Sequence, residues 1–157
     1  MLEEIYHFFN NEMLYLWINL GVIPFWLLLI FLPQSYLSRY LATSIFPVLL
    51  LSSTYVFVLY NAYLNSFDFD QNFSLYLGLS YVSELFSESY FLLMFWIHFV
   101  SINLFVGGWM IKDSNRFTIN KVIMFFPLVI TYFIGPIGIF IYWIIKIIRA
   151  KRMGLFD

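Results

Sequence analysis

The chain has 157 residues, of which 62% are hydrophobic, 24% aromatic and only 11% charged. Its 8 Lys and Arg residues and 9 Asp and Glu residues are too few to cover a water-soluble domain of this length. The formal net charge of −1 gives no basic field for nucleic acid, and the absence of cysteine gives no disulfide framework. We therefore expect a membrane protein with no nucleic-acid partner and no metal site.

Four apolar stretches without Asp, Glu, Lys or Arg follow one another, at about residues 13–33, 41–64, 91–111 and 122–145. A helix rises about 1.5 Å per residue, so about 20 residues cross a hydrocarbon core of about 30 Å. In lipid a helix also satisfies its own backbone polar groups. The pattern predicts an all-α integral membrane bundle of four transmembrane helices, which forms a single domain over residues 1–157.

The connection between the second and third stretches is acidic and amphipathic. Leu75, Leu79, Val82 and Phe86 recur at the spacing of one helical face. This spacing predicts a short interfacial helix at about residues 73–86, lying at the membrane surface. A packing role outside the membrane is an equally open interpretation.

The last stretch contains Gly135-Pro136-Ile137-Gly138, which allows two structures. One is a spanning helix kinked at Gly135-Pro136, since neighbouring helices can satisfy the freed carbonyls, and this is the structure we expect. The other is a re-entrant hairpin. With four crossings the basic residues divide four against four, so the positive-inside rule gives no orientation, whereas a hairpin would place all eight on one side.

Polar residues inside the apolar stretches are candidates for a site or for helix packing. His98 lies near the middle of the third stretch, where it is either a proton donor or acceptor in a pocket or a structural histidine bonded to another helix. Asn103 and Gly107 favour close helix packing. The fourth stretch carries a second group of small and polar residues, namely Thr131, Gly135, Pro136, Gly138 and Tyr142.

The order of these residues resembles the abscisic-acid-deficient-4-like family, small four-helix membrane proteins whose plant members are needed to make the carotenoid neoxanthin. The third stretch and its exit give Trp96, His98, Asn103-Leu104-Phe105-Val106-Gly107, Trp109 and Asp113. The fourth gives Pro127-Leu128, Thr131, Gly135-Pro136-Ile137-Gly138 and Tyr142, and the first gives Asn19, Pro24, Trp26-Leu27-Leu28-Leu29 and Pro33, followed by Arg39.

This resemblance implies that the protein acts on or binds a carotenoid. Neoxanthin synthesis converts an epoxide into an allene with a hydroxyl, which needs one proton delivered and one removed but formally no redox cofactor. The resemblance makes His98 and Asp113 the catalytic candidates of a cofactor-free carotenoid isomerase, although 15 residues of helix, about 22 Å, separate them. Asn103 stands where the family pattern has an acidic residue, and an amide exchanges no proton at neutral pH.

We expect membrane lipid and a carotenoid as partners, and the sequence leaves self-association into a homo-oligomer open. The first stretch begins about a dozen residues into the chain, which leaves no room for a plastid transit peptide, so we expect a multi-pass protein of a bacterial inner membrane. The alternative function is a non-catalytic membrane scaffold or lipid-binding bundle, which Asn103 favours. A transporter is disfavoured because the chain has no inverted repeat or charged path.

Overall fold

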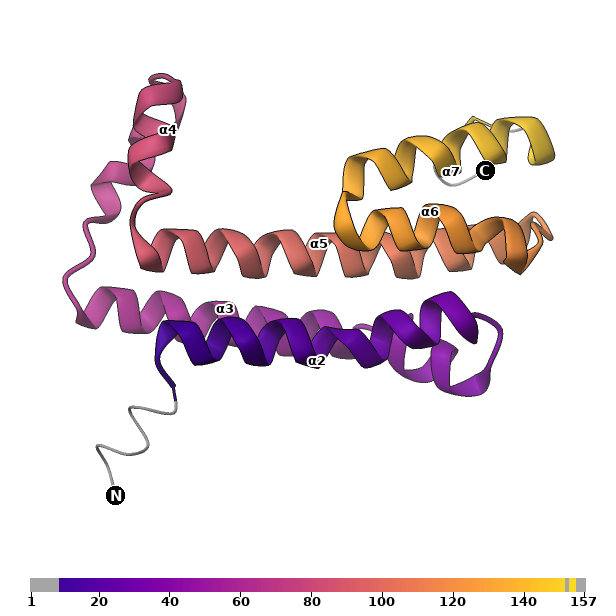
Figure 1. Cartoon of the computed structure of the whole chain (residues 1–157), viewed down its shortest axis with the longest axis horizontal. Coiled ribbons are helices and arrows are strands. Elements are labelled where there is room, and N and C mark those ends of the chain that lie inside the picture. The colour runs from indigo at the N-terminus through magenta and orange to yellow at the C-terminus, as the bar shows by residue number, and fades with distance from the viewer. Residues whose placement is uncertain (1–8, 152, 155–157) are drawn as a thin grey trace. The chain divides into compact units, whose positions relative to one another are not determined.

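The computed structural model describes residues 9–151, 153 and 154, and this part of the chain contains helices and no strands. The α-helices are α2 (Asn11–Phe31), α3 (Phe46–Leu64), α4 (Leu79–Leu85), α5 (Ser89–Arg116), α6 (Lys121–Phe133) and α7 (Gly135–Ala150) (Figure 1). A π-helix η1 (Ser38–Ala42) precedes α3, and a 3-10 helix η2 (Phe69–Tyr76) precedes α4. The predicted all-α fold class is confirmed.

The chain forms two compact units, each built from two separate stretches. Unit 1 comprises Met1–Leu20 and Leu50–Phe99, and unit 2 comprises Gly21–Leu49 and Val100–Asp157. Helices α2, α3 and α5 each contribute residues to both units. The expectation of a single domain stays a prediction.

Three helical segments of the described chain are long and apolar enough to cross a membrane. They are Asn11–Phe31, Ser38–Leu64 and Ser89–Arg116, with mean hydropathies of 2.1, 1.8 and 1.8. Each coincides with one of the first three predicted spans. The third is longer than predicted, because α5 continues to Arg116 and so includes Lys112 and Asp113 in its last turns.

The prediction of a fourth span kinked at Gly135-Pro136 is wrong. Residues 121–150 form two helices of 13 and 16 residues, about 20 and 24 Å long, which break at Ile134 and fold back on each other (Figure 1). A proline in the first turn of a helix loses no backbone hydrogen bond, because the N–H groups there have no partner within the helix. A proline also disfavours helical geometry at the residue that precedes it. Pro136 therefore lies in the first turn of a new helix, α7, instead of bending α6. Each helix is shorter than the bilayer core.

The hairpin closes through small residues. A Cβ atom added to Gly138 would lie 2.0 Å from Thr131 Oγ1 and 2.7 Å from the carbonyl oxygen of Pro127, so α7 touches the backbone of α6 here. Such contact requires glycine at position 138. The alternative of a hairpin therefore matches the arrangement inside unit 2.

The predicted interfacial helix at 73–86 is also two elements instead of one. Helix η2 is capped by Asp68, whose side chain accepts a hydrogen bond from the Asp70 backbone N–H, and α4 begins after Gly78. Within unit 1, α4 packs against η2 and buries Leu85. The structure contains no membrane, so a position at the membrane surface stays a prediction.

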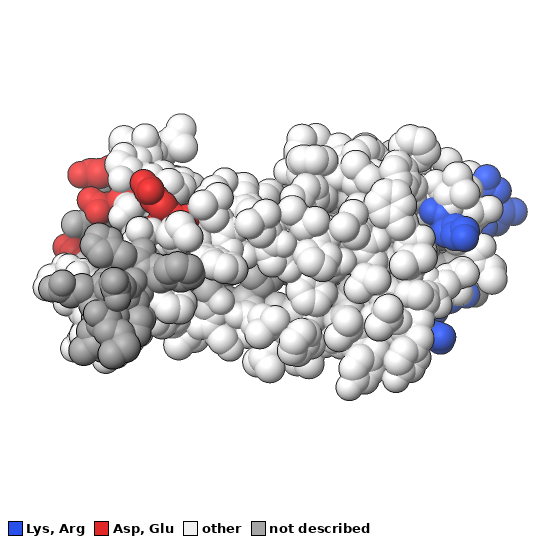
Figure 2. All heavy atoms as spheres, turned by 60° about the horizontal axis from the view of Figure 1, so that its bottom comes forward, with Lys and Arg blue, Asp and Glu red and all other residues white. Residues whose placement is uncertain are grey.

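Charges separate between the two units. Among the described residues, every Lys and Arg belongs to unit 2, and every Asp and Glu except Asp113 belongs to unit 1. Figure 2 shows Asp and Glu gathered on surfaces of unit 1, and Lys and Arg gathered on one part of unit 2. Arg152, one of the eight basic residues in the sequence, lies outside the described residues.

Candidate functional site

A buried ionic cluster joins the last turn of α5 to α7 in unit 2. The Lys146 ammonium lies 2.8 Å from Asp113 Oδ2, and the side chains of the two residues are 0% and 2% exposed. The Tyr142 hydroxyl donates a hydrogen bond of 2.5 Å to the same carboxylate oxygen. Tyr142 and Lys146 are four residues apart on α7, so both side chains leave the same face of the helix.

Lys146 has further partners that compensate for the loss of water. Its ammonium also donates a hydrogen bond of 2.8 Å to the backbone carbonyl of Gly154. The aromatic rings of Phe117, Trp143 and Trp109 lie around it, with centroids 4.9, 5.1 and 5.9 Å from the nitrogen. A buried charge with these contacts is held in place, and removing either charge would leave the other one unpaired.

The second carboxylate oxygen of Asp113 has no hydrogen-bond partner among the described residues. An ionised carboxylate with a free oxygen can accept a proton or a hydrogen bond. Asp113 is nevertheless buried at the contact between α5 and α7, and it does not line the two unit 2 pockets described below. Its observed contacts are therefore those of a group that fixes α7 against α5.

Three predicted motif residues pack the helices of unit 2 closely. A Cβ atom added to Gly135 would lie 2.1 Å from Asn103 Oδ1, so the start of α7 lies directly on the Asn103 side chain of α5. Gly107 meets the indole ring of Trp26 in the same way, at 2.8 Å. The Asn103 amide nitrogen is buried and has no partner in the described part of the chain.

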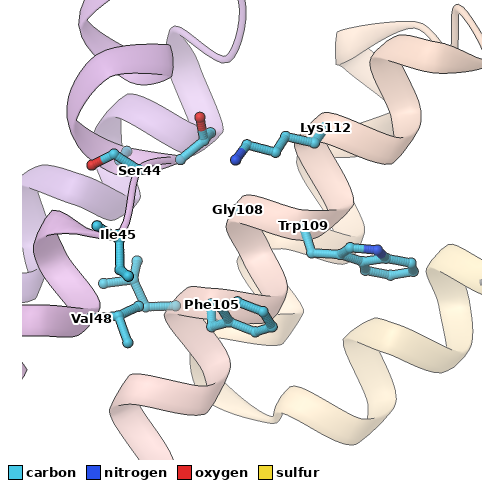
Figure 3. A pocket seen from close by; sticks show the side chains of 10 residues that line it. Ser44, Ile45, Val48, Phe105, Gly108, Trp109 and Lys112 are labelled. Carbon is cyan, nitrogen blue, oxygen red and sulfur yellow. The ribbon is translucent and has the colours of Figure 1, made fainter. Parts of the chain in front are cut away.

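An apolar pocket of about 430 Å³ lies on the opposite side of α5 from α7, as Figure 3 shows. The segment before and at the start of α3 forms one wall, and α5 forms the other. The wall residues are Ala42, Thr43, Ser44, Ile45 and Val48 on the first side, and Leu104, Phe105, Gly108, Trp109 and Lys112 on the second. We call this hollow the apolar pocket.

Polar groups are confined to one end of the apolar pocket. Lys112 reaches toward Ser44 across this end, while Val48 and Phe105 face each other at the other end (Figure 3). Trp109 also lines the pocket, but its ring extends away from Ser44 and Val48 (Figure 3) and contacts the ring of Tyr142 edge to face, with the ring centroids 5.5 Å apart. The pocket is thereby connected through one aromatic ring to the buried ionic cluster.

The other two predicted site residues, Trp96 and His98, belong to unit 1. Trp96 donates a hydrogen bond of 3.2 Å to the side-chain oxygen of Asn19, which ties α5 to α2. His98 is exposed and lines a small hollow of about 230 Å³ with Tyr55 and Phe91 among its neighbours. The structure does not bring His98 to Asp113, and its catalytic role stays a prediction.

Sequence reasoning placed Pro136 and Tyr142 in the site region but missed Lys146. Pro136 is exposed at the start of α7, where it acts on the backbone. The available signal for Lys146 was its spacing, because Gly138, Tyr142 and Lys146 follow one another at intervals of four residues along a buried stripe. A lysine on such a stripe requires a buried anion, and Asp113 provides it.

Comparison with known proteins agrees with the residue pattern. No curated protein and no solved structure matches the chain. Residues 13–142, most of the chain, match the family described as ABA DEFICIENT 4-like. The matched region includes the three candidate spans except the first two residues of Asn11–Phe31, and it includes the apolar pocket, Asp113 and Tyr142. The chain therefore belongs to the ABA DEFICIENT 4-like family.

Proposed function

We propose that this membrane protein of the neoxanthin-synthesis family binds a carotenoid, with one end ring in the apolar pocket of unit 2. The observation that carries the proposal is the pocket itself, which has apolar walls and polar groups at one end only. Its volume of about 430 Å³ lies within the range of roughly 300–1,000 Å³ that ligand sites occupy. The volume suits an end ring, and the polyene would continue along the apolar helix surface.

The pocket chemistry suits an apolar ligand that carries an oxygen on its end ring. Ile45, Val48 and Phe105 offer carbon surface to a ring and its methyl groups. The Lys112 ammonium lies at the polar end, where it can donate a hydrogen bond to a ring oxygen, whereas the Ser44 hydroxyl already donates its proton to the Leu41 carbonyl. Binding would therefore orient the ligand with its oxygen toward Lys112.

The same geometry favours binding over a complete isomerisation inside the pocket. Opening an epoxide to an allene needs an acid at the oxygen and a base at the polyene. Lys112 is the one titratable side chain among the described residues that line the pocket, and the carboxylate of Asp113, bonded to Tyr142, does not line it. Lys112 could act as the acid at the epoxide oxygen, whereas the residues that line the pocket supply no base for the polyene.

Carotenoid binding can be tested on the purified full chain in neutral detergent, with violaxanthin, the epoxide carotenoid from which neoxanthin is made, as the probe. We expect violaxanthin to co-elute with the protein and its absorption spectrum to shift. Phe105→Ala removes an aromatic wall worth roughly 1.5–3 kcal/mol when a ligand covers it, so affinity should fall about tenfold or more. Ile45→Trp should fill the pocket and reduce binding further.

Phe126→Ala is the matched control, since Phe126 and Phe105 are similarly exposed, at 64% and 61%, and Phe126 does not line the pocket. This variant should bind violaxanthin as the wild type does. A wild-type protein that retains no violaxanthin would contradict the proposal and favour a non-catalytic scaffold. Equal losses in the two alanine variants would contradict the location of the site.

A further inference from the structure

A cationic groove adjoins the apolar pocket in unit 2. It has a volume of about 620 Å³ and lies between the turn after α2, the π-helix η1 and the last turns of α5. The side chains that line it are Gln34, Arg39, Thr43, Ile111, Lys112, Asn115 and Arg116. Thr43 and Lys112 also line the apolar pocket, so the two hollows share part of their walls.

Three cations share this groove and have no counter-ion among the residues that the structure describes. Arg39, Lys112 and Arg116 are exposed, no acidic side chain lines the groove, and none of the three forms an ion pair with a described residue. Lys146 in the same unit differs, since its charge is matched by Asp113. Cations held near one another repel unless an anion joins them, so the groove has an electrostatic preference for an anion.

The groove chemistry selects a phosphate among anions. Arginine offers paired N–H donors that match two phosphate oxygens, and Arg39 and Arg116 come from different elements that flank the groove. Lys112 adds a point charge between the apolar pocket and the groove. The amides of Gln34 and Asn115 supply further donors at the rim.

The position of the groove selects a lipid as the source of the phosphate. The candidate spans Asn11–Phe31 and Ser89–Arg116 both end beside it, and span ends lie at the level of lipid head groups. We propose that Arg39, Lys112 and Arg116 bind the phosphate of an anionic phospholipid in the surrounding bilayer. Each cation near such a lipid surface adds to the attraction.

Lipid binding is measured by native mass spectrometry on the full chain in neutral detergent, with phosphatidylglycerol and phosphatidylcholine supplied in equal amounts. We expect the wild type to retain phosphatidylglycerol in preference. The double variant Arg39→Gln/Arg116→Gln should lower that preference roughly thirtyfold, because each of the two removed charges contributes a factor of about five. The control Arg149→Gln/Lys151→Gln removes the same amount of charge from exposed sites at the end of α7. This control should keep the preference for phosphatidylglycerol.

Three results would overturn the proposal. The first is a wild type without preference between the two lipids, and the second is an equal loss in the control variant, which would reduce the effect to net charge. The third is full displacement of phosphatidylglycerol by inorganic phosphate, which would make the groove a site for the free anion. The proposal is separable from carotenoid binding, because Arg39 and Arg116 do not line the apolar pocket and their variant should still bind violaxanthin.

The α6–α7 hairpin carries a second, independent inference about orientation. Because α7 folds back on α6, the start of α6 at Lys121 and the last turns of α7, which include Lys146, lie at the same end of unit 2. Lys146 touches Asp113 in the last turn of α5, which brings the basic residues of α5 to this end as well. We infer that this end of unit 2 faces the cytoplasm, since cytoplasmic segments carry the excess of Lys and Arg.

Single-cysteine variants test the orientation, because the natural sequence contains no cysteine. Thr118→Cys probes the connection between α5 and α6, and Met153→Cys probes the segment after α7; both positions are exposed. In intact cells a membrane-impermeant maleimide should label neither variant, and after permeabilisation it should label both. Labelling of both variants in intact cells would overturn the orientation, and labelling of only one would show that residues 121–150 cross the membrane.

Discussion

Replacing Gly138 by alanine is the most direct test of the hairpin. The added Cβ atom would lie 2.0 Å from Thr131 Oγ1, 2.5 Å from the Thr131 backbone nitrogen and 2.7 Å from the Pro127 carbonyl oxygen. Ordinary contacts begin at 3.4 Å. Two of the three obstacles are backbone atoms, so a side-chain rotation cannot relieve the overlap, and α7 must move away from α6 by about 1 Å.

The expected cost follows from that displacement. Overpacking of a close helix contact lowers the free energy of unfolding by about 1–3 kcal/mol. We expect Gly138→Ala to lie at the upper end of this range, because the added Cβ atom overlaps backbone atoms. For a chain of this size each kcal/mol lowers the melting temperature by roughly 2–4 °C, so we expect a decrease of about 6–12 °C. The measurement is thermal unfolding of the purified protein in detergent, followed by circular dichroism.

Gly21→Ala is the matched control, because a Cβ atom at Gly21 in α2 would meet no atom within 4 Å. Alanine there should leave stability unchanged or raise it by up to about 1 kcal/mol through helix propensity. A Gly138→Ala protein that melts at or above the wild-type temperature would refute the close approach of α6 and α7. Equal destabilisation by the two variants would show a general sensitivity to glycine replacement.

Three further substitutions test the contacts around α5. Lys146→Met leaves the buried Asp113 carboxylate unpaired and should cost about 3–5 kcal/mol, and adding Asp113→Leu should restore most of it in thermal melts; absence of rescue would argue against the pair. Tyr142→Phe removes the hydrogen bond to Asp113 and should cost about 1–3 kcal/mol in the same assay, whereas an unchanged melting temperature would contradict a buried bond. Trp96→Phe should cost about 0.5–1.5 kcal/mol by losing its bond to Asn19, and a double variant with Asn19→Ala should cost little more if the two residues are coupled.

The structure brings some of the predicted site residues together and not others, and the reason lies in helix faces. Asn103, Gly107, Trp109 and Asp113 follow one another on α5, and the structure places all four in unit 2 against elements that the residue pattern also singled out. Spacing along one helix shows which side chains share a face, but it does not show which neighbour that face meets. The pairing of Asp113 with Lys146 therefore could not be derived from the sequence.

The fourth apolar stretch shows the same limit for the fold. Its length satisfied the requirement for a span, and a kink at Pro136 and a break at Ile134 both agree with the local sequence. The choice depended on whether α7 could approach the backbone of α6, which Gly138 permits. That approach is a long-range contact, so no local pattern could decide it.

The sequence by itself determined the helical class, the first three candidate spans and the family, because these depend on the length of apolar runs and on the order of residues within them. Only the tertiary structure decided the hairpin, the buried pair of Asp113 and Lys146, and the adjoining apolar pocket and cationic groove. Each of these requires side chains from separate elements to meet. In lipid, helices pair through shape and a few polar contacts, and a generally apolar surface does not specify its partner.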